Sequence, residues 1–243
     1  MKKTVILTLL FVLVGFTYHP GKASLHGIPL KEYQSLTLYT ETSNLKNYEM
    51  LKEIIFLPES KFNESAAAQM IERVNQIDDI ILQGLVDQGV VLKLFTGLLT
   101  DEPTASYLKG KKPRGYSETG PTWDNVPGIG GSEVVLAKIG HSEKGQGHGS
   151  INLELHELAH SIDKFVFDSI SEDPYFQSIW KKEVKQLFPE RSYFSDYPEE
   201  YFAEVFAMYY LSSQSRNQLQ HTAPVTYQFF LELSETQQRI DNV

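Results

Sequence analysis

The sequence of 243 residues predicts an α+β fold, in which a small mixed β-sheet with an edge strand beside a central helix precedes a mostly helical C-terminal lobe. Short runs rich in β-branched residues alternate with longer segments in which apolar residues recur every three or four positions. The strand signals cover residues 54–57, 90–95 and 132–139, whereas helical signals continue toward the end of the chain. This order favours a sheet covered by helices and a second helical layer.

Residues 1–23 are predicted to form a secretory signal peptide. Lys2 and Lys3 precede an apolar run from Val5 to Phe16, and Gly21 and Ala23 are the small residues expected before a cleavage site. Because the run is too short to span a bilayer, no stable membrane insertion is expected after cleavage. We therefore expect a secreted, extracellular protein. Its lack of cysteine excludes disulfides and thiol catalysis.

Residues 24–50 are polar with few apolar repeats, and they are interpreted as a leader or irregular arm. The remaining residues, 51–243, suffice for one domain with a sizeable core. A strand is expected at residues 54–57, followed by a single helix from residue 63 or 65 to Gly89. A second strand at 90–95 and a brief helix at 101–108 complete this part.

Residues 111–131 predict a long ordered loop, because glycine and proline recur through it. The loop contains two large aromatic residues, Tyr116 and Trp123, which pack the loop or line a binding site. The strand expected at 132–139 is interpreted as an edge strand. An extended peptide could add to such an edge by backbone hydrogen bonds.

Residues 151–166 predict a helix that carries the pattern H-E-x-x-H at His156, Glu157 and His160. On a helix, residues four apart share a face, so the two imidazoles can bind one metal ion. The glutamate between them can then act as general base on a water molecule. The alternative is a buried helix in which these residues meet by chance.

A helix is predicted at 174–187 with Asp173 as its cap, and another begins at Pro198, which suits a first helical position. Glu200 and Glu204 then share one face of the second helix, and either can supply the third ligand that a zinc site needs. An acidic first turn is also a common response to the helix dipole. A third histidine further along the first helix is excluded, because Val166 stands there.

The charge pattern restricts the partners. The formal net charge of −9 argues against binding to nucleic acid, which requires a basic face. We expect a monomer.

Several longer motifs point to one family. HELAH is followed by YxxxYPEEYFAEVFA and preceded by GLLTDEPTASYLKG, TWDNVPGIGGS and KGQGHGSINLEL. With these motifs the chain resembles the Pro-Pro endopeptidases, secreted bacterial zinc peptidases whose catalytic domain is similar to that of anthrax lethal factor. The resemblance covers about residues 53–230.

The resemblance implies a zincin-type domain that binds one Zn²⁺ ion through His156, His160 and Glu200. It implies Glu157 as base and Tyr193 as the donor to the oxyanion, although nothing in its local sequence distinguishes Tyr193 from an ordinary core or surface tyrosine. Glu204 would orient a ligand histidine. The implied substrate cleft contains Arg114, Tyr116, Gly130, Gly131, Ser132 and Glu199, and Trp123 is available as an aromatic wall.

The implied activity is hydrolysis of peptide bonds between two prolines in proline-rich proteins of the cell surface. Two alternatives come from other classes. One is a lethal factor-like binding or toxin-accessory module without activity, and the other is a non-proteolytic zinc hydrolase of the cell wall.

Overall fold

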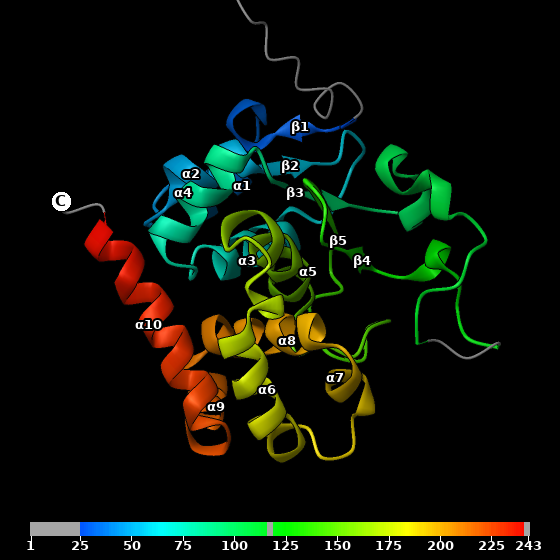
Figure 1. Cartoon of the computed structure of the whole chain (residues 1–243). Helices are drawn as coiled ribbons and strands as arrows, with labels where there is room; N and C mark the ends of the chain where they lie inside the picture. The colour runs from blue at the N-terminus through cyan, green and yellow to red at the C-terminus, as the bar shows by residue number, and fades with distance from the viewer. Residues whose placement is uncertain (1–24, 116–118, 241–243) are drawn as a thin grey trace, which may run out of the picture.

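A five-stranded mixed sheet forms the upper part of the molecule in this computed structural model, and helices fill the lower part (Figure 1). The strand order is β1-β2-β3-β5-β4. The three inner strands run parallel, whereas β1 and β4 pair antiparallel to their neighbours. The strand bounds are Ile28–Pro29, Ile55–Leu57, Val91–Phe95, Gly128–Ile129 and Val134–Lys138 for β1 to β5.

The structure describes residues 25–115 and 119–240. The predicted signal peptide and Tyr116 lie outside the described residues. Within these residues, no helix combines the length and the hydropathy that crossing a membrane would need.

Two apolar layers cover the sheet. One face packs on helices and contributes to the main core, in which Leu92, Leu94 and Val135 are buried. The other face carries a smaller cluster around Phe95 and Leu136, covered by short 3-10 helices at Leu99–Asp101, Pro103–Leu108 and Trp123–Asn125. The brief helix predicted at 101–108 is therefore two 3-10 segments.

The prediction of an irregular arm at residues 24–50 is wrong. This segment contains β1, helix α1 (Leu36–Thr42) and the start of α2 (Tyr48–Ile54). Leu30 and Leu38 reach the main core, so two isolated apolar residues anchor a segment whose polar composition suggested solvent exposure. Ser35 caps α1 by accepting a hydrogen bond from the Leu38 amide.

The single helix predicted up to Gly89 is two helices, α3 (Glu64–Val74) and α4 (Asp79–Gln88). The Asn47 side chain donates to the backbone carbonyls of Asn75 and Ile77, so these groups have partners outside a helix. Ile77 is buried in the break, which explains why the apolar spacing looks continuous. The predicted stop at Gly89 is confirmed, with φ +69°.

The strand predicted at 132–139 is present as β5, but it is not the edge strand. The edge strand is β4, which pairs with β5 through Gly128 opposite Ala137 and Ile129 opposite Leu136. Two residues inside the predicted loop thus form the edge beside helix α5, the helix at Leu153–Ser161. No strand is predicted there, because glycine disfavours strands and a single isoleucine is too short a run to indicate one.

The helix predicted at 151–166 is α5 (Leu153–Ser161), which continues as one π-helical turn at Ile162–Val166. Asn152 caps its start by accepting a hydrogen bond from the Leu155 amide. Helix α5 lies between the sheet and helix α8 (Pro198–Leu211), which is buried on nearly all sides (Figure 1). This position holds the two histidines between the two halves of the molecule.

The C-terminal lobe confirms the predicted helical layer. Asp173 caps α6 (Pro174–Leu187) by accepting from the Tyr175 amide, and Pro198 begins α8, both as predicted. The other helices of the lobe are α7 (Ser192–Asp196), α9 (Ser213–Thr222) and α10 (Pro224–Ile240). Phe176, Phe202 and Phe230 join α6, α8 and α10 in one aromatic cluster.

Candidate metal centre and its cavity

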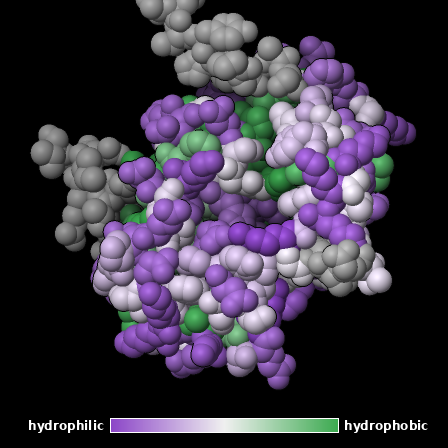
Figure 2. Space-filling model, turned by 45° about the vertical axis from the view of Figure 1, so that its right-hand side comes forward, coloured by the Kyte–Doolittle hydropathy of each residue, from purple (hydrophilic) through white to green (hydrophobic). Residues whose placement is uncertain are grey.

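A cavity of about 900 Å³ lies between the sheet and the helical lobe. The recess that separates these two halves is visible in Figure 2, with hydrophilic surface inside it. Its walls come from the loop around Arg114, the edge strand β4, helix α5 with its π-helical turn, the loop before α5, and helices α7 and α8. Segments far apart in the sequence therefore meet at one concave surface.

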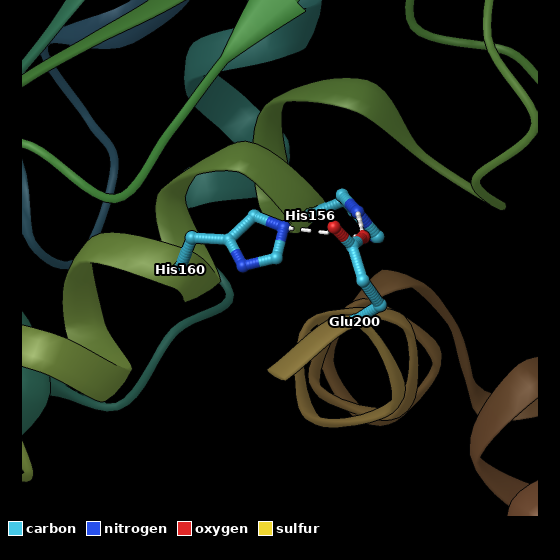
Figure 3. Close-up of side chains that lie close together, drawn as sticks. All are labelled: His156, His160 and Glu200. Carbon is cyan, nitrogen blue, oxygen red and sulfur yellow. Dashed lines mark ion pairs between the residues drawn. The ribbon is translucent and has the colours of Figure 1, made fainter. Parts of the chain in front are cut away.

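His156, His160 and Glu200 converge in this cavity. The two histidines project from α5 toward Glu200 in the first turn of α8 (Figure 3). The Glu200 Oε2 atom lies 3.3 Å from Nε2 of His156 and 3.5 Å from Nε2 of His160. One ligand atom from each residue lies within 4.8 Å of the other two.

The chemistry of these groups suits a metal cation. Burial by itself lowers the pKa of His156, but the carboxylates of Glu200 and Glu204 outweigh it and raise this pKa above its usual range. Burial raises the pKa of Glu200, and the two imidazoles lower it well below its usual range. In their neutral forms, the imidazoles would direct lone pairs at a carboxylate oxygen. A cation between them removes this repulsion, so His-His-Glu forms a suitable metal site.

Glu204 lies one turn beyond Glu200 and contacts the other nitrogen of His156. Its Oε2 atom is 3.2 Å from Nδ1 of His156, and the Ile151 amide donates to the same carboxylate at 3.1 Å. This arrangement fixes the ring plane and turns Nε2 toward Glu200. The structure thus distinguishes two glutamates that spacing alone leaves equivalent.

Glu157 lines the cavity and lies against the edge strand. A Cβ on Gly128 would lie 2.9 Å from its Cγ atom, and a Cβ on Gly130 would collide with its backbone carbonyl. The glycines therefore let the strand approach the helix. Burial raises the pKa of the Glu157 carboxyl, while the imidazoles of His156 and His160 oppose this shift. A carboxylate with a raised pKa is better suited to hold a transferred proton.

Tyr193 on α7 also lines the cavity, and its hydroxyl donates to Oε1 of Glu200 at 2.7 Å. Its ring contacts Gly115, where a Cβ would lie 3.0 Å from the ring edge. Burial and the Glu200 carboxylate raise the pKa of Tyr193, so the hydroxyl keeps its proton at neutral pH. It can therefore donate a hydrogen bond within the cavity.

We expect Tyr193→Phe to reduce kcat about 100-fold or more, the effect of losing one donor to an oxyanion, with a smaller change in KM. The metal content should be measured beside the kinetics, because the hydroxyl also contacts Glu200. A wild-type kcat would restrict Tyr193 to packing. A loss of metal parallel to the loss of activity would instead restrict it to holding Glu200.

Arg114 connects the loop to helix α8. Its guanidinium is 2.8 Å from Oε1 of Glu199 and 3.2 Å from Oε1 of Glu200, and it stacks on the Tyr197 ring at 3.8 Å. It is half-exposed and lines the cavity with Glu199. The loop therefore contacts a predicted metal ligand directly, so its position and the metal centre are coupled.

Of the other residues predicted for the cleft, all but one line the cavity among the residues that the structure describes. Trp123, Gly130 and Gly131 line the cavity, whereas Ser132 is not among its lining residues. The Ser132 hydroxyl donates to the carbonyl of Val134, and its own carbonyl accepts from Ser161. Ser132 therefore stabilises the turn between β4 and β5.

The sequence did not point to several cavity residues, chiefly Arg191, His148 and Lys164. His148 lies in a glycine-rich segment before α5, and both of its ring nitrogens are engaged, with Ser150 and with the carbonyl of His141. Lys164 follows the motif by one helical turn and donates to the carbonyl of Gly131. A helical projection from His160 could have identified Lys164, but no local pattern marks Arg191.

Known proteins resemble this chain over most of its length. The family described as "Anthrax toxin lethal factor, N- and C-terminal domain" matches residues 40–233. A Pro-Pro endopeptidase of Paenibacillus alvei is 40% identical over 196 residues, which are 81% of this chain and 90% of the relative. A Pro-Pro endopeptidase of Clostridioides difficile strain 630 is 43% identical over 194 residues, 80% of this chain and 87% of the relative.

A solved structure shows the same relationship. The Pro-Pro endopeptidase PPEP-2 from Paenibacillus alvei superposes with a TM-score of 0.73 at 42% identity, covering 76% of this chain and 99% of that structure. The resemblance inferred from the motifs is therefore confirmed. The chain belongs to the anthrax lethal factor family and, within it, to the Pro-Pro endopeptidases.

Proposed function

We propose that this chain is a secreted zinc endopeptidase that hydrolyses the bond between two prolines in proline-rich, cell-surface proteins. One observation carries this proposal: His156, His160 and Glu200 converge in a cavity that Glu157 and Tyr193 also line. Metal ligands, a general base and a hydroxyl donor are the groups that peptide hydrolysis at a metal requires. Membership of the Pro-Pro endopeptidases supports the substrate.

The spacing of two of the three pairs of donor atoms is compatible with zinc. Ligand atoms about 2.0–2.1 Å from a tetrahedral zinc ion lie roughly 3.3–3.4 Å from one another. The separations of 3.3 and 3.5 Å between Glu200 Oε2 and the two imidazole nitrogens are close to this value. Zinc would take three protein ligands here, as in catalytic sites that keep one position open.

The chain's own residues supply the proton transfers. When bound, zinc acts as a Lewis acid that activates a water molecule and polarises the scissile carbonyl. The Glu157 carboxylate accepts a proton from the attacking water and passes it to the leaving nitrogen. The Tyr193 hydroxyl donates to the oxygen that becomes negative. In the net reaction, one water molecule adds across the C–N bond: its hydroxyl joins the carbonyl carbon, and its other proton joins the leaving nitrogen.

The backbone beside the cavity supports a substrate with few N–H donors. The edge strand β4 has two residues, and two positions beyond it the Gly131 amide donates to the Ser161 hydroxyl while the Gly131 carbonyl accepts from Lys164, so these backbone groups already have protein partners. Few backbone hydrogen bonds can therefore form between this edge and an ordinary extended peptide. Proline has no N–H and a fixed φ, so a proline-rich peptide loses fewer hydrogen bonds at such an edge than other peptides do.

We expect a peptide library with proline on both sides of the cut to be cleaved roughly 10- to 100-fold better, per position, than matched peptides with alanine. Proline loses less conformational freedom on binding, and alanine brings an N–H that costs about 1–3 kcal/mol when it stays unpaired. The ratio of kcat/KM values measures this preference. Equal cleavage of Pro-Pro and Ala-Ala peptides would leave a general endopeptidase, and cleavage of neither would favour a module without activity or a cell-wall hydrolase.

Secretion is supported by the sequence of residues 1–23 alone. We expect the protein from the culture medium to begin at Ser24, which mass spectrometry of its N-terminal peptide would measure. A mature chain that retains Lys2 and Lys3 would contradict this part of the proposal.

A further inference from the structure

Arg191 connects three parts of the cavity wall. It precedes α7, and its guanidinium lies 4.2 Å above the centre of the Phe194 ring. Its Nη2 donates to the carbonyl of Gly149 at 3.0 Å, and its Nη1 lies 3.5 Å from Oε1 of Glu204. The loop before α5, the helix α8 and the segment before α7 therefore meet at one cation.

We propose that Arg191 is a positioning residue of the metal centre, which acts through Glu204 to hold His156 in its metal-binding orientation. The inference rests on the metal site proposed above. Its function would be to fix a carboxylate that itself contacts no metal. Neither the motifs nor the spacing of the glutamates indicate such a residue.

Charge and burial explain why Glu204 needs this partner. The side chain of Glu204 is 4% exposed, and a buried carboxylate is costly unless it is hydrogen-bonded and paired. The Ile151 amide and His156 Nδ1 supply hydrogen bonds, and Arg191 brings a permanent positive charge. With this charge in place, the carboxylate stays between the amide and the imidazole, and the His156 ring keeps its plane.

Arg191 also fixes the loop that leads into α5. A Cβ on Gly149 would lie 3.0 Å from Nη2 of Arg191, so the absence of a side chain lets the guanidinium rest against this backbone. Two residues later, the Ile151 amide donates to Glu204. Arg191 thus contacts the loop and the carboxylate that this same loop must meet.

The chain offers a matched control. Arg216 donates from Nε to the carbonyl of Tyr209 at 2.6 Å and stacks on the Tyr209 ring at 4.5 Å, away from the cavity. Arg216→Met removes a carbonyl hydrogen bond and a ring contact, as Arg191→Met does, but it leaves Glu204 unchanged. The difference between the two variants therefore reports the contact with Glu204.

The experiment measures zinc affinity by competition with a chromophoric chelator, together with kcat and KM. Arg191→Met should bind zinc about 10-fold more weakly. This is the low end of the range for losing a residue that supports a metal ligand without touching the metal. Arg216→Met should bind zinc like the wild type. Arg191→Lys, which keeps the charge, should recover part of the affinity. In a Glu204→Gln background, Arg191→Met should cause little further loss, because both changes act through one contact.

Three outcomes would overturn the proposal. Wild-type zinc affinity with a raised KM in Arg191→Met would make Arg191 a substrate contact. An equal loss in the wild-type and Glu204→Gln backgrounds would show that it acts by another route, and an equal loss in Arg216→Met would show a general effect on stability. His156→Ala tests the metal site apart from the role of Arg191. Zinc binding that survives this change would overturn the set of ligands itself.

Discussion

Glu200→Ala is expected to lose its metal and, with it, all measurable proteolysis. Its carboxylate is the group that faces Nε2 of both histidines, at 3.3 and 3.5 Å. Two neutral imidazoles alone form a much weaker site, because the negative ligand and one coordination bond are both gone. Metal content after dialysis and cleavage of a Pro-Pro peptide measure the two effects.

Glu204→Ala is the matched comparison, since this glutamate lies on the same helix and the same face. It contacts Nδ1 of His156 rather than Nε2, so we expect the metal to remain with roughly 10- to 100-fold lower affinity. The ranking is the informative result. Full metal content in Glu200→Ala, or complete loss only in Glu204→Ala, would exchange the two roles.

For Glu200 and Glu204, the sequence predicts the shared helix face but not the contacts of each carboxylate. Pro198 sets the start of α8, and helical spacing then places Glu200 and Glu204 on one face. Spacing cannot tell which nitrogen of His156 each carboxylate meets. That depends on how α8 crosses α5, which is determined by packing of buried residues over the length of both helices.

The elements that the sequence predicted well have strong local causes. Asp173 caps α6, Gly89 ends α4 in a left-handed conformation, and β3 and β5 are runs of β-branched and apolar residues. The errors have long-range causes instead. The segment around α1 is ordered by two buried leucines, and the edge strand β4 depends on pairing with β5 rather than on its own residues.

Site residues divide in the same way. His156, Glu157 and His160 form a pattern because one helix presents them together. Tyr193 and Arg191 come from a separate short segment, and only the tertiary fold brings them to the cavity. Residue type and local pattern do not distinguish such a tyrosine or arginine from an ordinary surface residue, so only the family resemblance indicated Tyr193 and nothing in the sequence indicated Arg191.

Glu157→Gln is expected to fold, retain its metal and lose about 10²- to 10⁴-fold in kcat, the contribution of a positioned general base. The amide has nearly the shape of the carboxylate, so the contact with Gly128 remains, but it cannot accept a proton. Burial already disfavours the charged form of Glu157, so the neutral side chain should not lower the thermal unfolding temperature. Single-turnover kinetics with a Pro-Pro peptide would measure the chemical step.

Glu154→Gln provides a control on the same helix. Glu154 is fully buried and pairs with Arg73 at 3.1 Å, and it does not line the cavity. Burial raises the pKa of Glu154 as it does that of Glu157, and the amide oxygen can still accept from Arg73, so Glu154→Gln should keep both its stability and its turnover. If Glu157→Gln retained more than about a tenth of the wild-type kcat with its metal in place, a general base would contribute less than the expected range, and another group would have to accept the proton.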